Sequence, residues 1–198
     1  QIAFIRDVYL NYQKAYVYGN LLKIKGSIDG RLLIHWGNDS IPENTRKGTL
    51  YFYHNTVSIE SDQNTHWNMT LFDISTIEES VECFNNIVHI KSETAGESAS
   101  TLNLTRSGVN GALNLGRNWI SNGYINGGGT VNGLNNLLNV IDGDTPIDLI
   151  TLKLTNDSTA GGNAQILPLY LDNIIFEYAA HQSNKERTNL VDIGAYAK

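Results

Sequence analysis

Four stretches of the chain alternate apolar and polar residues on both sides of a single asparagine. They align on Asn20, Asn55, Asn86 and Asn118, with spacings of 35, 31 and 32 residues, and they read AYVYGNLLKI, LYFYHNTVSI, VECFNNIVHI and LNLGRNWISN. The shared apolar positions before the asparagine are Ala15 and Val17, Leu50 and Phe52, Val81 and Cys83, and Leu113 and Leu115. Those after it include Leu22, Val57, Val88 and Ile120. A period of two predicts a strand on each side of the asparagine, with its apolar side chains on one face.

A third apolar segment recurs between these pairs, at residues 31–37, 70–76 and 100–106. Each repeat then carries three short strands, which indicates a solenoid whose coils stack on one another. The predicted fold class is all-β: a right-handed parallel β-helix of about four three-stranded coils with a C-terminal closing segment. An antiparallel sandwich also has many short strands, but it has no reason to repeat one corner residue every 31–35 residues.

The recurrent asparagine is predicted to form the corner between the two strands. Asparagine tolerates the left-handed backbone conformation that a sharp corner demands. Stacked on successive coils, the side-chain amides can also hydrogen-bond to one another as a ladder. A hairpin at the same place would favour Asn-Gly or Asp-Gly, and neither pair stands at these four asparagines.

Composition favours one folded domain, because 198 residues with 41% hydrophobic and 17% charged content can bury a full core. We assign residues 1–120 to the coils and residues 121–198 to a loop-rich terminal coil and closing tail. The net charge of −6 argues against nucleic acid as a partner, and no stretch is apolar enough to predict a membrane span. The single cysteine, Cys83, excludes an internal disulfide and a cysteine metal cluster.

The end of the chain resembles the closing stretch of right-handed parallel β-helix proteins of the pectate-lyase-like superfamily. The resemblance is carried by residues 147–168 and 181–198, and most of all by Asp192, Ile193, Gly194, Ala195 and Tyr196. The chain departs from that pattern at NDSTAGG, which replaces a proline-containing version, and at Ala197, where glutamate is typical. The resemblance implies the C-terminal portion of a longer bacterial protein, located outside the cell or in the periplasm. It also implies that further N-terminal coils or a homo-oligomer cover the first coil.

The third strand supplies the candidate site. Its alternation predicts that His35, Asp73 and Asn103 point outward, one above another on one parallel sheet. β-Helix lyases and hydrolases typically build their substrate groove on this surface, so the resemblance implies a polysaccharide site here. The adjacent loop, residues 37–48, adds Asp39, Glu43, Arg46 and Lys47.

A polysaccharide lyase needs a base for the proton next to a uronate carboxylate and a cation that neutralises this carboxylate. We therefore predict His35 or Lys47 as the base and Arg46 as the neutralising cation. Asn103 and Asp39 are predicted to bind substrate, and Asp39 and Asp73 are a candidate pair for Ca²⁺. The alternative is that these residues form an ordinary solvated strand face.

Three other features have two interpretations each. Cys83 is predicted to be a buried, inert thiol rather than a nucleophile. The equivalent residues Tyr18, Tyr53 and Phe84 are predicted to stack as an aromatic ladder, or else to offer a platform for sugars. The acidic segment DGDTPID, residues 142–148, suggests Ca²⁺, but a turn followed by a strand explains it better.

The sequence thus favours a protein that binds or cleaves an extracellular acidic polysaccharide, with lyase-like chemistry. The alternative hypothesis is a non-catalytic β-helix that serves as an adhesin, a tailspike-like fibre or a surface scaffold.

Overall fold

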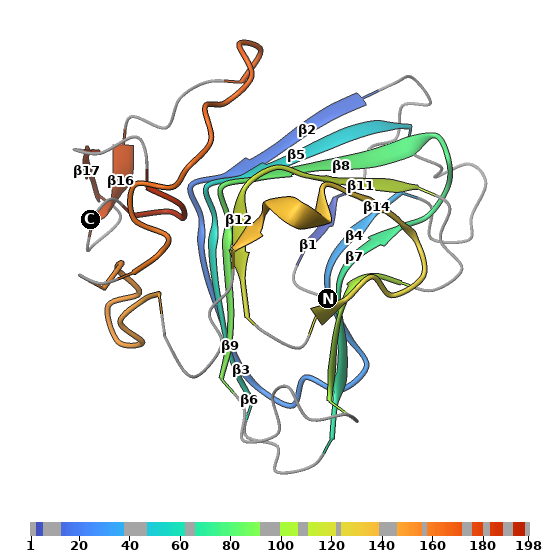
Figure 1. Ribbon diagram of the computed structural model, residues 1–198, viewed down its shortest axis with the longest axis horizontal. Coiled ribbons are helices and arrows are strands. Elements are labelled where there is room, and N and C mark those ends of the chain that lie inside the picture. Colours follow the sequence, from blue (N-terminus) through green and yellow to red (C-terminus); the bar gives the residue numbers. More distant parts are fainter. Residues whose placement is uncertain are drawn as a thin grey trace.

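The computed structural model is a right-handed parallel β-helix (Figure 1). It describes residues 3–5, 13–37, 47–61, 66–91, 100–106, 111–121, 124–138, 146–155, 158–171, 176–179, 183–187 and 192–196. Three parallel sheets, each of five strands, form its walls, and we name them sheets A, B and C. The chain passes from sheet B to sheet C to sheet A in each coil. None of the helices in the described ranges is long and apolar enough to cross a membrane.

The strands of each sheet come from successive coils. Sheet A contains β1 (Ala3–Ile5), β4 (Arg31–Trp36), β7 (Asn68–Ile74), β10 (Thr101–Thr105) and β13 (Tyr124–Ile125). Sheet B contains β2 (Gln13–Tyr18), β5 (Gly48–Tyr53), β8 (Glu79–Phe84), β11 (Ala112–Leu115) and β14 (Thr130–Asn132). Sheet C contains β3 (Leu21–Gly26), β6 (Thr56–Ser61), β9 (Ile87–Lys91), β12 (Asn118–Ile120) and β15 (Leu137–Leu138). The stack thus continues past residue 120 through β13, β14, the 3₁₀ helix η2 (Leu134–Asn136) and β15.

The predicted registers of sheets B and C are confirmed. Ala15 pairs with Leu50, Leu50 with Val81 and Val81 with Leu113, and the same holds for the row that begins at Val17. In sheet C, Leu22, Val57, Val88 and Ile120 form one row. All of these side chains belong to one hydrophobic core or pack against it, so the period of two in the sequence marks the inner face of these two walls.

The asparagines form the predicted ladder at the corner between sheets B and C. The Nδ2 atom of Asn20 donates to Oδ1 of Asn55 at 3.0 Å, Asn55 to Asn86 at 3.0 Å, and Asn86 to Asn118 at 2.9 Å. Each acceptor oxygen also receives the backbone N–H of the preceding ladder asparagine, at 2.9–3.0 Å. The side chains therefore satisfy backbone groups that the corner leaves out of the sheets.

The prediction that the ladder asparagine itself takes the left-handed conformation is wrong. The residue before it does so: Gly19 has φ 66°, His54 has φ 50° and Asn85 has φ 54°. The corner thus uses two residues, of which the first turns the backbone and the second ties adjacent coils together.

The register of sheet A differs from the prediction. Ile34 pairs with Phe72 and His35 with Asp73 as expected, but Leu102 pairs with Met69 and Asn103 pairs with Thr70. The reason is a change of phase inside the strand, because the neighbours Leu71 and Phe72 are both in the core. A displacement by three residues therefore still leaves the apolar residues of β10 facing inward.

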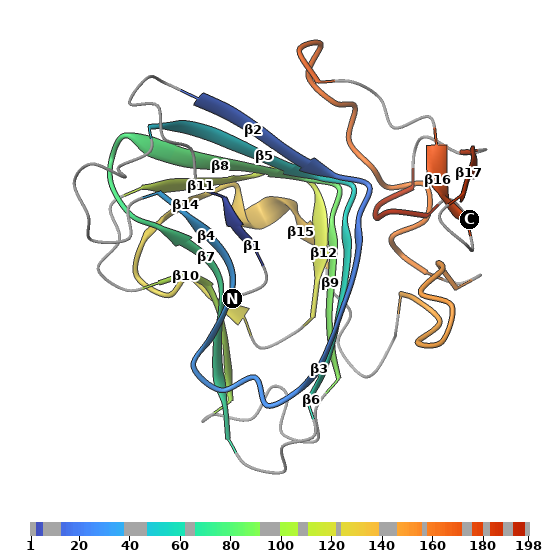
Figure 2. The ribbon, with the colours of Figure 1, turned by 180° about the vertical axis from the view of Figure 1, so that it is seen from behind.

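The closing tail packs outside the corner between sheets B and C, as Figures 1 and 2 show from opposite sides. Ile193 is fully buried in a second apolar cluster with Ile87 and Trp119 of the coils. The N–H of Gly194 donates to the carbonyl of Asn85 at 2.7 Å, and the N–H of Ala195 donates to Oγ1 of Thr56 at 3.0 Å. The motif of residues 192–196 is thus one of the parts of the tail that dock on the coils. Earlier in the tail, β16 (Phe176–Ala179) and β17 (Ser183–Glu186) form an antiparallel pair.

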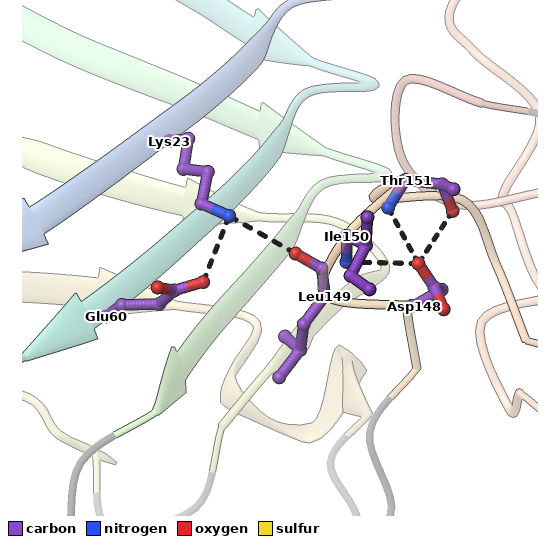
Figure 3. A network of polar contacts seen from close by, with 6 residues as sticks. All are labelled: Lys23, Glu60, Asp148, Leu149, Ile150 and Thr151. Carbon is purple, nitrogen blue, oxygen red and sulfur yellow. Dashed lines mark hydrogen bonds and ion pairs between the residues drawn. The ribbon is translucent and has the colours of Figure 1, made fainter.

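A second contact fixes the start of the tail to sheet C (Figure 3). Lys23 Nζ lies 3.1 Å from Oε1 of Glu60 and donates to the carbonyl of Leu149 at 3.2 Å. Asp148 accepts hydrogen bonds from the N–H and hydroxyl groups of Thr151 and from the N–H of Ile150, which lower the pKa of its carboxyl group. The predicted turn at Asp148 is therefore confirmed, but the strand expected after it is not formed by residues 149–155. Residues 142 and 144 lie outside the described ranges.

Candidate functional site

The outer face of sheet A carries a cavity of about 400 Å³. It crosses three adjacent coils, and its lining residues are Gly30, Arg31, Leu32, Asn68, Thr70, Asn103, Arg106 and Gly127. Two guanidinium groups, two amides and a hydroxyl therefore face this space. No aspartate or glutamate stands among its described lining residues, although the whole chain has a net charge of −6.

The strands explain how these residues come together. Leu32, Thr70 and Asn103 occupy one row across β4, β7 and β10. Asn103 donates from Nδ2 to Oδ1 of Asn68 and, at 3.2 Å, to the carbonyl of Met69. These bonds hold the Asn103 amide against the strand, so its position at the wall of the cavity is fixed.

Asn103 does not stand above Asp73, as the sequence analysis expected. The position level with Asp73 belongs to Arg106, whose Nη1 lies 3.0 Å from Oδ2 of Asp73. Asp73 is buried, whereas the side chain of Arg106 is 60% exposed. Because a buried carboxylate needs a partner, the ion pair fixes one nitrogen of Arg106 and leaves its other donors near the cavity.

His35 lies beside this pair on β4, in register with Asp73. The imidazole is half-buried, and its Nε2 atom lies 3.3 Å from Oγ of Ser75. The position of His35 next to Asp73 agrees with the sequence expectation, and the role of His35 as a base stays a prediction.

Lys47 forms an ion pair with an acidic side chain. Its Nζ lies 2.6 Å from Oε1 of Glu78 in an exposed ion pair at the start of β5. The role of Lys47 as a base stays a prediction. Arg46 and Asp39 lie outside the described residues, so their predicted roles as neutralising cation and substrate or calcium ligand stay predictions.

A calcium site has little support from Asp73. Its carboxylate is paired with Arg106, and a guanidinium competes directly with a cation for the same oxygen. Within the described ranges, no group of three or more His, Cys, Asp and Glu side chains is placed to hold a metal ion.

Sequence reasoning missed Arg31 and Arg106. Arg31 stands at the start of β4 and pairs with Met69, and Arg106 directly follows β10. Both stand at strand ends, where the alternation of the strand gives no information about side-chain direction. The arginine that closes the segment STLNLTR was the available signal, but it required the correct register of β10.

Cys83 is buried among the core residues, as predicted. Burial raises the pKa of its thiol to about 12, so the thiolate is scarce at neutral pH.

No known protein family, no curated protein and no solved structure matches the chain.

Proposed function

We propose that the outer face of sheet A binds a segment of an acidic polysaccharide. The observation that carries this proposal is the lining of the 400 Å³ cavity, where Arg31 and Arg106 face the same space as Asn103. Guanidinium groups bind carboxylates in a planar, two-pronged geometry, and amides bind the hydroxyl groups of sugars. A uronic acid unit presents both kinds of group.

The parallel stack suits a polymer. Adjacent strands lie about 4.8 Å apart, so each coil places one set of side chains at regular intervals along the axis of the solenoid. A chain laid across β4, β7 and β10 would meet a new set of polar groups at each strand. The resemblance of residues 192–196 to the pectate-lyase-like superfamily supports the same class of ligand and a location outside the cell or in the periplasm.

We extend this proposal to cleavage of the bound polysaccharide by a lyase-like reaction. In that reaction the proton on the carbon next to the uronate carboxylate moves to a base. Its electron pair forms a double bond to the neighbouring carbon, and the glycosidic oxygen on that carbon leaves and takes up a proton. His35 is the proposed base, and Arg106, which Asp73 orients, is the proposed cation for the carboxylate.

Binding is tested with polygalacturonate, alginate and chondroitin sulfate in affinity electrophoresis, followed by calorimetry on the strongest binder. We expect Arg31→Gln to weaken binding by about tenfold, since a charge-assisted hydrogen bond contributes roughly 1.5–3 kcal/mol. Lys14→Gln is the matched control, because it removes one positive charge from the exposed surface of β2 on another sheet. Equal affinities of the two variants would overturn the proposed site.

Cleavage is tested by the ultraviolet absorbance of unsaturated products. We expect wild-type protein to produce them and His35→Ala to abolish turnover while the polysaccharide still binds. Binding without any product would favour the non-catalytic alternative, an adhesin or scaffold.

A further inference from the structure

The outer face of sheet B is rich in aromatic side chains. Its outward positions form two rows that run along the solenoid. One row consists of Tyr16, Tyr51, Glu82, Asn114 and Asn132, and the other of Tyr18, Tyr53 and Phe84. Tyr16 stacks on Tyr51 with 5.1 Å between ring centroids, and Tyr18 stacks on Tyr53 at 4.9 Å. The aromatic ladder expected from the sequence is therefore present at Tyr18 and Tyr53.

The tail covers only part of this face. Leu167 and Leu171 of the tail form an apolar cluster with Tyr51, Tyr53 and Phe84, which are at most 7% exposed. This cluster is the docking surface of the tail, and it accounts for three of the five aromatic side chains in the two rows.

The other aromatic residues stay open to solvent around a hollow. Tyr16 is 45% exposed, Tyr18 is 47% exposed and Tyr170 of the tail is 57% exposed. Together with Tyr53 they line a cavity of about 320 Å³ between the tail and the first two coils. Tyr170 is tilted by 59° to Tyr51, with 5.6 Å between their centroids, so it forms a wall of the hollow rather than a further step of the ladder.

The apolar cluster that docks the tail does not include Tyr16, Tyr18 or Tyr170, so the docking of the tail does not explain why these three rings gather around the hollow. Within the described ranges, the ladder covers one face of the Tyr16 and Tyr18 rings and leaves the other face without an aromatic partner. Exposed aromatic side chains gathered around a cavity are a feature of binding sites, because each ring offers a rigid apolar surface at low entropic cost.

The row of Tyr16 and Tyr51 continues with the polar residues Glu82, Asn114 and Asn132. Asn132 donates to Oδ1 of Asn114 at 2.7 Å, and Asn114 donates to Oε1 of Glu82 at 2.7 Å. Burial raises the pKa of the half-buried Glu82 carboxyl group, and the Asn114 amide partly offsets this shift. Glu82 pairs with Tyr51, whose ring centroid lies 5.6 Å from that of Tyr170, so the carboxylate lies near this wall of the hollow. Burial, and after it the Glu82 carboxylate, raises the pKa of Tyr170.

We propose that this groove, lined by Tyr16, Tyr18, Tyr53 and Tyr170 and with the Glu82 carboxylate beside Tyr51, binds a neutral carbohydrate chain. A pyranose ring has an apolar face of C–H groups and a rim of hydroxyl groups. The tyrosines stack against the first, while the Glu82 carboxylate accepts hydrogen bonds from the second. The Glu82 carboxylate repels an acidic sugar. The groove therefore differs in ligand and in position from the cationic cavity on sheet A.

The test uses the whole chain and three neutral probes, cellohexaose, xylohexaose and laminarihexaose, each titrated by calorimetry. We expect at least one probe to bind. Tyr18→Ala and Tyr170→Ala are each expected to raise its Kd by about tenfold, because each removes one stacking surface. Ile150→Ala is the control for loss of exposed apolar area, since Ile150 is 90% exposed on the tail outside the groove.

The outcomes separate this proposal from the site on sheet A. Arg31→Gln leaves the affinity for the neutral probe unchanged if the groove is its site, and an equal loss in Arg31→Gln and Tyr18→Ala contradicts the proposal. Failure of all three probes to bind the folded protein overturns it. If sedimentation shows a dimer that Tyr18→Ala dissociates, and no probe binds, the tyrosines serve self-association instead. If Tyr170→Ala loosens the tail, the Kd of the neutral probe for Tyr18→Ala, on the edge strand β2, still decides whether the groove is the binding site.

Discussion

The asparagine ladder makes a quantitative prediction about stability, because its members differ in burial. Asn86 stands inside the ladder and is fully buried. Its Nδ2 atom donates to the carbonyl of Phe52 at 2.8 Å and to Oδ1 of Asn118 at 2.9 Å. Its Oδ1 atom accepts from the backbone N–H of Asn55 at 2.9 Å and from Nδ2 of Asn55 at 3.0 Å. Asn86→Ala removes these four bonds at once, together with the weaker one from Nδ2 to Sγ of Cys83 at 3.3 Å.

The magnitude follows from the groups left behind. Each buried backbone partner that loses its hydrogen bond costs about 1–3 kcal/mol, and two such partners remain, the N–H of Asn55 and the carbonyl of Phe52. We therefore expect Asn86→Ala to lower the free energy of unfolding by about 3–5 kcal/mol. For a chain of this length, that corresponds to a decrease of the Tm by roughly 10 °C.

Asn20→Ala is the matched control at the exposed end of the same ladder. The Asn20 side chain donates to Oδ1 of Asn55, but the backbone N–H of Asn20 donates to the same oxygen at 3.0 Å and remains after the substitution. No buried acceptor is left alone, so the expected cost is about 1 kcal/mol.

Urea unfolding followed by circular dichroism measures both costs, with thermal melts as a second readout. Asn86→Asp tests whether the lost hydrogen bonds cause the destabilisation, because aspartate keeps the shape of asparagine. It replaces the Nδ2 donor with an oxygen that faces the carbonyl of Phe52 and Oδ1 of Asn118. We expect it to destabilise the fold at least as much as alanine. Equal losses in Asn86→Ala and Asn20→Ala would refute the claim that buried amide pairing holds the coils together.

Further predictions concern the tail and three buried groups. Gly194 has φ +95°, and a Cβ atom there would lie 2.7 Å from Cδ1 of Ile87, so Gly194→Ala should cost about 1–3 kcal/mol and expose the tail to limited proteolysis. Burial lowers the pKa of His54 from 6.5 to about 3 and that of His89 to about 4. The unfolded chain therefore binds more protons, and stability falls as the pH drops below 6.5. Each histidine accounts for about 2 kcal/mol lost by pH 5, and urea titrations should show a shallower pH dependence in His54→Gln. Cys83 should not react with a thiol reagent in native protein and should react once urea unfolds the chain, which absorbance at the wavelength of the released chromophore records.

The sequence predicted the parts of the fold in which one residue type repeats at one structural position. The apolar rows of sheets B and C and the ladder followed from aligning four asparagines, because the corner between these sheets has a constant length. Sheet A lies between the loops of variable length, so its register has no such marker. There the phase change at Leu71 and Phe72 concealed the displacement of β10.

The candidate sites show why function was harder to predict than fold. His35 and Asp73 were placed beside each other correctly, because β4 and β7 change phase at the same level, at Leu33–Ile34 and at Leu71–Phe72. Arg106 was missed because it stands after a strand, where its direction depends on the ion pair with Asp73. Tyr170 lies in the tail, and its distance of 5.6 Å from Tyr51 is a tertiary contact with no trace in the local pattern.

The two-residue corner also explains where the tail leaves the coils open. At the second corner, the imidazole of His54 lies 3.3 Å from the carbonyl of Gly194. At the third, Asn85 exchanges two hydrogen bonds with the backbone of Gln165, at 2.8 and 2.9 Å. The turning residues of these corners thus have side chains that bind the tail. The first corner has Gly19, which has no side chain to offer, and among the described contacts none joins it to the tail. Tyr18, next to Gly19 on the edge strand β2, is 47% exposed, so the proposed neutral-sugar groove lies at the corner whose turning residue offers the tail no side chain.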